Sequence, residues 1–197
     1  MDEKTALEEL QFIRQVIEET KRDFIYNGLD YILWGVIVIT GMMLQYILIL
    51  SKVHFSFFWL WVALISLGWI LSFFNGRKLK NKAPHGYHKK IVMHVWLASG
   101  IAMTLIGFLG PASGAISPMA ISPLISVVVG SAYFISGNIT KSKWFTNLSF
   151  GWWGGAIIMF FVMNVHQFLI MAILMIFFQT IPGIILYKKY KKEIAVA

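Results

Sequence analysis

The stretch LDYILWGVIVITGMMLQYILIL, residues 29–50, decides the fold class. It contains one charged group, Asp30, and otherwise consists almost entirely of apolar side chains. As a helix rising 1.5 Å per residue, a run of this length crosses a hydrocarbon core of about 30 Å. The stretch therefore predicts a transmembrane helix.

Five further apolar stretches of similar length follow the first. They predict spans at about 57–74, 91–109, 115–139, 144–163 and 168–187. The fourth contains Pro118 and Pro123, and we expect it to begin or bend at one of them. Pro182, beside Gly183, predicts a bend in the sixth.

These stretches predict an all-α polytopic membrane protein with six transmembrane helices. The predicted domains are a cytoplasmic amphipathic helix over 1–27, the transmembrane domain over 28–190 and a basic cytoplasmic tail over 188–197. The composition agrees, because charged residues make up 13% of the chain and about 25% of a soluble domain. The chain has no cysteine, which excludes thiolate metal ligands and Cys nucleophiles. We predict no cofactor and no metal.

The distribution of Lys and Arg predicts the orientation. Sixteen of the 17 basic residues lie before the first span, after the sixth, or in the two loops on that same side, and Lys52 alone lies opposite. Cytoplasmic loops carry such an excess, so we predict a multi-pass protein of the cell inner (plasma) membrane with both termini in the cytoplasm. The basic loops are expected to contact anionic lipid. No nucleic-acid binding is expected, because no folded basic surface is evident.

Residues 5–26 predict an amphipathic helix with a coiled-coil-like apolar seam. The seam includes Leu10, Ile13, Ile17 and Phe24. Residues 2–23 hold seven acids and four bases, whereas helices that bind anionic lipid are rich in Lys and Arg. We therefore expect this helix to contact a protein partner, which is a second copy of the chain, another protein, or the chain's own basic loop 76–90 with its six positive charges. The alternative is a helix that only shields the first span.

Polar side chains gather at the predicted cytoplasmic ends of the spans. Asp30 is the only acid in or near a span, and His94 is expected at a similar depth. An acid inside a membrane marks function by default, and the alternative is a solvated carboxylate at a helix N-terminus. The predicted cluster contains Asp30, His94, Asn27, Asn75, Asn138 and Asn147. The four Asn residues serve equally as helix caps.

A narrow pathway beside the fourth span is a second candidate site. Its predicted lining is Gln45, Pro118, Ser122, Pro123, Ser126 and Gln179. The small side chains of Ser122 and Ser126 are also typical of close helix packing, which is the alternative interpretation.

The chain has no catalytic set whose geometry supports an enzyme, and we predict no catalytic residue. The favoured function is a non-enzymatic membrane module, a transport component, regulator or assembly subunit, that acts through its cytoplasmic face and N-terminal helix. Two alternatives stay open. One is a small transporter or channel for an apolar or weakly polar solute, and the other is a membrane metal or haem protein or enzyme that uses His94 and Asp30.

Overall fold

The structure is a computed structural model that describes residues 28–53, 55–80 and 87–196. Within these ranges the regular elements are all helices, and no strand occurs. The predicted N-terminal helix lies outside the described residues, and with it Asn27 and the seam of Leu10, Ile13, Ile17 and Phe24.

The helical segments are long α-helices interrupted by short turns of other geometry. In chain order they are α2 (Gly28–Leu50), α3 (Phe57–Lys80), α4 (Tyr87–Thr104), the π turn η1 (Leu105–Leu109), α5 (Gly110–Ala112), the 3-10 turn η2 (Pro118–Ala120), α6 (Ile121–Ile139), α7 (Lys143–Phe161), α8 (Gln167–Met175), the π turn η3 (Ile176–Thr180) and α9 (Ile181–Val196).

Five helical stretches are long and apolar enough to cross a membrane. They are 28–50, 57–77, 90–112, 118–139 and 167–189. Helix α7 is not among them although it has 19 residues, because its first half contains Lys143, Asn147 and Ser149. The described residues therefore form an all-helical fold of the membrane-protein kind with five candidate spans.

The prolines lie where a helix begins or where its geometry changes. Pro118 opens η2 after Ser117, whose backbone is extended, and Pro123 lies in the first turn of α6. A proline in a first turn loses no hydrogen bond that the helix would otherwise make. Pro182 is the second residue of α9, which follows η3. The wider π turn accommodates a residue that cannot donate to the preceding turn.

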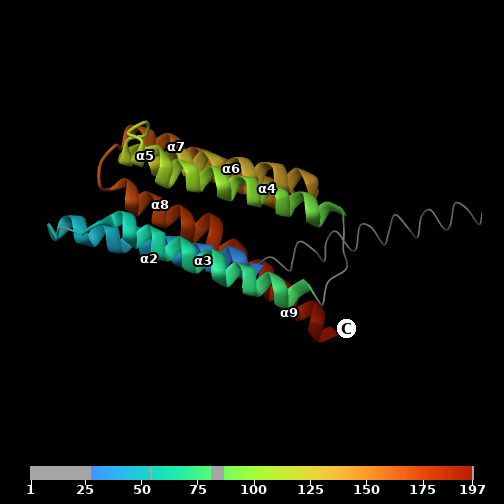
Figure 1. Cartoon of the computed structure of the whole chain (residues 1–197). Helices are drawn as coiled ribbons and strands as arrows, with labels where there is room; N and C mark the ends of the chain where they lie inside the picture. The colour runs from blue at the N-terminus through green and yellow to red at the C-terminus, as the bar shows by residue number, and fades with distance from the viewer. Residues whose placement is uncertain (1–27, 54, 81–86, 197) are drawn as a thin grey trace, which may run out of the picture.

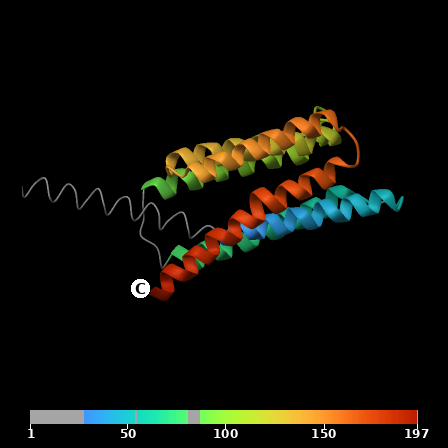
Figure 2. The same ribbon diagram turned by 180° about the vertical axis from the view of Figure 1, so that it is seen from behind.

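The helices form two layers (Figures 1 and 2). We call α2, α3 and the continuous α8–η3–α9 helix the first layer, and α4, α6 and α7 the second layer. Each layer is packed mainly within itself, and α6 and α7 contact each other along their length. The starts of α2 and α4, the α6–α7 turn and the ends of α3 and α9 lie at one end of the bundle. We call it the basic end, because exposed Lys and Arg side chains gather there.

Glycine allows two of the closest helix contacts. A Cβ at Gly137 of α6 would lie 2.5 Å from the backbone N of Thr146 in α7. A Cβ at Gly28 of α2 would lie 2.7 Å from the backbone N of Tyr187 in α9. Real Cβ atoms do not approach backbone this closely, so these positions set the spacing of helices within each layer.

Candidate functional site

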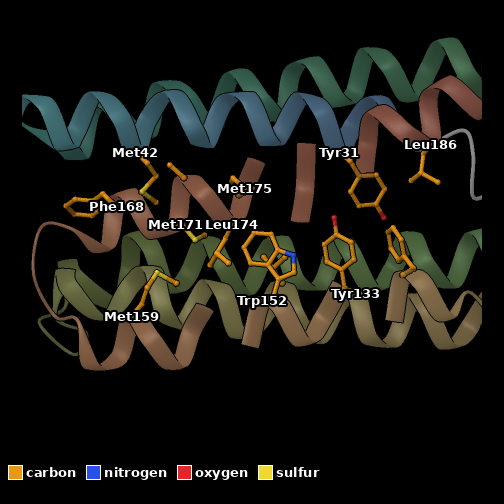
Figure 3. Packing of buried hydrophobic residues seen from close by; sticks show 13 residues of the cluster. Tyr31, Met42, Tyr133, Trp152, Met159, Phe168, Met171, Leu174, Met175 and Leu186 are labelled. Atoms are coloured by element: carbon orange, nitrogen blue, oxygen red, sulfur yellow. The ribbon is translucent and has the colours of Figure 1, made fainter. Parts of the chain in front are cut away.

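The two layers meet through large side chains, and an aromatic cluster lies toward the basic end (Figure 3). Tyr31 of α2 reaches out of the first layer, with its ring centroid 5.4 Å from that of Trp96 in α4. The same ring lies 5.8 Å from Tyr133 of α6 and 5.5 Å from Phe145 of α7. Tyr133 also stacks with Trp152 of α7 at 6.3 Å. We call these five residues the aromatic joint, because Tyr31 fits among side chains from three helices of the other layer.

Burial shows that the aromatic joint is a closed part of the interior. Tyr133, Phe145 and Trp152 are each 0% exposed, and Tyr31 is 6% exposed. The sequence patterns did not predict these five residues as a site. The available signal was the position of Tyr133 and Trp152 well inside their apolar stretches.

The π turn η3 directs polar groups toward both layers. Tyr133 donates a hydrogen bond from Oη to Oε1 of Gln179, at 2.6 Å, which links the second layer to the first. Thr180 donates from Oγ1 to the carbonyl of Met175, at 3.0 Å, and packs against Gly35 of α2. Since π bulges occur frequently at functional sites, this turn is the most distinctive backbone feature at the layer interface.

Asp30 lies in the first turn of α2 and faces α3. Its carboxyl group interacts with the side chains of Asn75 and Ser72, and Ser72 also accepts a hydrogen bond from Nε1 of Trp34 at 3.0 Å. Oδ1 of Asp30 is buried with no hydrogen-bond partner among the described residues. His94 is exposed on α4. The structure therefore brings Asp30 together with Asn75 of the predicted polar cluster, on the α2–α3 contact.

The remaining described members of that cluster are at the surface. Asn138 is exposed and donates from Nδ2 to the carbonyl of Phe134 in its own helix, at 2.8 Å. Its own carbonyl accepts from the backbone N of Lys141 in the α6–α7 turn, at 3.2 Å. Asn147 is exposed on α7. Asn138 thus contributes to the end of a helix, as a cap does.

The predicted pathway residues are spread across the molecule, and most of their polar groups have partners. Ser126 donates to the carbonyl of Trp152 at 2.7 Å. Gln45 accepts from Nε1 of Trp61 at 2.8 Å, on the α2–α3 contact. Gln179 accepts a hydrogen bond from Tyr133 of the aromatic joint. Of the others, Ser122 and Pro123 are buried and Pro118 is exposed.

A few buried polar atoms have no hydrogen-bond partner among the described residues. Besides Oδ1 of Asp30 they are Nε1 of Trp96, Nε1 of Trp152, Oγ of Ser136 and Oε1 of Gln167. Trp96 and Trp152 both belong to the aromatic joint. The indole N–H of Trp96 interacts with the side chain of Tyr31. That of Trp152 is an unpaired donor in an apolar interior, which is unfavourable.

The basic end owes its name to eight exposed side chains. They are Arg77, Lys90, Lys141, Lys143, Lys188, Lys189, Lys191 and Lys192. Exposed aromatic residues lie beside them, since Phe74 is 55% exposed and Trp144 40% exposed. Asp30 is the only acid among the side chains that the structure describes. The basic end therefore has positive charge and apolar surface together.

The fold and these contacts define the class: a helical membrane protein with an aromatic interior and one strongly basic end. Comparison of the chain with protein-family models, with curated proteins and with solved structures finds no match. Among the described residues, no three His, Cys, Asp or Glu side chains converge to hold a metal ion.

Proposed function

We propose that this chain is a six-span protein of the cell inner membrane and works as a non-enzymatic module. It serves as a transport component, regulator or assembly subunit through its cytoplasmic face and N-terminal segment. Both termini lie in the cytoplasm, and the basic end contacts anionic lipid. The partner of the N-terminal segment is another protein or a second copy of the chain.

The sixth span in this proposal is α7. It runs beside α6 along its length, and a turn over 140–142 reverses the chain between them. A helix that returns along a spanning helix from the same end crosses the same depth. The lower hydropathy of α7 is offset by burial of Phe145, Trp152 and Met159 inside the protein, each 0% exposed.

The observation that carries the proposal is the contrast between the basic end and the interior. Positive and aromatic side chains are exposed at the basic end, where a partner or lipid can reach them. In the interior, Ser126, Gln45 and Gln179 already have protein partners. A surface with unused binding groups favours contact with a partner over chemistry inside the bundle.

A pull-down with and without residues 2–23 tests this function. The full chain and the shortened chain are each purified from native membranes, and co-purifying proteins and oligomer mass are compared. We expect a stoichiometric partner, or a larger oligomer, that is lost on deletion. Identical partners and identical mass in both preparations would contradict the proposal.

Orientation has its own test, because a chain without cysteine permits single-site labelling. Lys52→Cys and Lys143→Cys are labelled in whole cells with a membrane-impermeant maleimide. We expect labelling at position 52 and protection at position 143. The opposite pattern would invert the topology, and labelling of both positions would mean that one of α3, α4 and α6 does not span the membrane.

A second candidate function is transport of a weakly polar solute between the two layers. The observation that favours it is the unpaired indole N–H group of Trp152, near the Tyr133–Gln179 hydrogen bond. A solute with a hydrogen-bond acceptor would satisfy this donor. Screening uncharged solutes for an increase in Tm tests this candidate, and any stabilisation should disappear in the Trp152→Phe variant, which lacks the donor.

A further inference from the structure

The acidic N-terminal segment and the basic end of the bundle have complementary chemistry. Residues 2–23 hold seven acids and four bases, a net charge of −3. The basic end exposes eight positive side chains, and no described acid neutralises them at the surface. Seven of the nine acidic residues of the chain precede the first span, while the described positive charge lies on the bundle.

Apolar surface is complementary as well. The segment has an apolar seam that includes Ile13 and Ile17. The basic end exposes Phe74 three residues from Arg77, and Trp144 directly after Lys143. A surface that combines cations with aromatic rings fits a helix that has one acidic and one apolar face.

The connection between the two is short. Helix α2 begins at Gly28, and Gly28 packs against the backbone of α9 at Gly183 and Tyr187. The segment therefore joins the bundle at the basic end itself. A helix over residues 5–26, as the sequence predicts, would be about 33 Å long, and six helices in two layers at about 8–10 Å spacing give an end of similar width.

We propose that residues 2–23 dock across the basic end of their own bundle. This inference rests on the proposed function, which places the basic end in the cytoplasm. It goes further by naming the surface that the segment contacts when no partner is bound. The docked segment covers the positive side chains, so a partner of the segment would compete with the bundle for it. The effective concentration of a segment tethered this closely favours its own bundle over a second copy.

Cysteine cross-linking in native membranes tests the docking. Gln11→Cys is combined with Lys143→Cys or Lys188→Cys, and a flexible bismaleimide is added. Gln11 is uncharged and precedes Gly28 by 17 residues, so a segment pointing straight away from the bundle would hold it about 25 Å beyond α2. The matched control is Gln11→Cys with Lys52→Cys, which lies at the opposite end.

We expect a cross-link within one chain that exceeds the Lys52 control several-fold. Replacing Glu8, Glu9, Glu18 and Glu19 by Gln changes the segment charge from −3 to +1, and the cross-linked fraction should then fall to the control level. High salt should act in the same direction, because the Debye length falls from about 10 Å at 0.1 M to about 3 Å at 1 M.

Three outcomes would overturn the inference. A cross-link only between two chains would make a second copy the occupant, and no cross-link above the control would leave the basic end to lipid headgroups. If the four Gln substitutions left the cross-linked fraction unchanged, charge attraction would be excluded as the cause of docking. The result is independent of the pull-down, since docking can be present with no partner found and absent with a partner found.

Discussion

Helices α6 and α7 differ sharply from α3 and α4 in what covers them. The α6–α7 pair contributes Tyr133, Phe145 and Trp152, all 0% exposed, to the centre of the molecule. Helices α3 and α4 carry large side chains that face outward, such as Trp59 at 66% and Ile101 at 53% exposure. The four helices belong to one membrane-type fold, so hydropathy alone does not say which helix is central. What distinguishes them is the placement of glycine, serine and aromatic residues on the buried faces.

The strongest test of this difference replaces one tryptophan in each region. Trp152→Ala removes a fully buried ring from the aromatic joint and should destabilise the protein by about 3–5 kcal/mol, the range for large cavities in cores. Trp59→Ala, on the exposed face of α3, should change stability by less than about 0.5 kcal/mol. Unfolding in mixed detergent micelles measures both. Equal losses would mean that α3 has a partner surface as important as the core.

Glycine substitutions test the close approach of α6 and α7. Gly137→Ala places a Cβ 2.5 Å from the backbone N of Thr146, so the helices must separate, at a cost of about 1–3 kcal/mol. Gly154→Ala on α7 is the matched control, because a Cβ there meets nothing within 4 Å. Its Tm should stay the same or rise, since alanine favours the helix by up to about 1 kcal/mol. A larger loss at Gly154 would contradict the packing described for α7.

The hydrogen bond from Tyr133 to Gln179 is open to a double-mutant cycle. Tyr133→Phe leaves Oε1 of Gln179 without its donor in an apolar interior and should cost about 0.6–2 kcal/mol, the range for polar contacts in membranes. Adding Gln179→Leu should restore part of the loss, because both polar partners are then absent. Additive losses in the double variant would show that the two side chains act independently.

The smallest expected effect is in the turns. Lys141, between α6 and α7, has φ of 51°, and Lys52, between α2 and α3, has φ of 54°. Glycine adopts this conformation without strain but is freer in the unfolded chain. Each Lys→Gly substitution should therefore stabilise the protein by about 0.5–1 kcal/mol. A similar increase in stability at both turns would show that the effect comes from the local backbone. An increase at Lys141 alone would show that it depends on the packing of α6 and α7.

The existence and approximate limits of most helices could be predicted from sequence, because a run of apolar residues such as 29–50 has few alternatives in a membrane. Details of the backbone geometry could not be predicted in this way. The stretch 91–109 ends as the π turn η1, which the sequence did not indicate, whereas the fourth span begins at Pro118, one of the two prolines predicted as its start or bend. Turn geometry of this kind depends on packing against neighbouring helices, and hydropathy does not contain it.

The candidate site was harder to predict than the spans. Depth along each span suggested Asp30 and His94 as a pair, but the structure gives Asp30 neighbours on α3. Which face of a helix meets which neighbour depends on the order of helices in space, and a single sequence does not specify that order. The aromatic joint could not be predicted for the same reason, because Tyr31, Trp96 and Tyr133 are far apart in the chain and meet only across the two layers.

The π turn η3 has a consequence for how the end of the last helix is aligned. A π turn holds one residue more than an α turn of the same span, so it acts as a one-residue insertion in the helical register. If the same residues formed ordinary α-helix, everything beyond them would be rotated by about 100°. The rotation would turn Lys188 and Lys189 toward another side and carry Gly183 away from Gly28. One extra residue in mid-helix thus sets the direction in which the chain's positive tail faces.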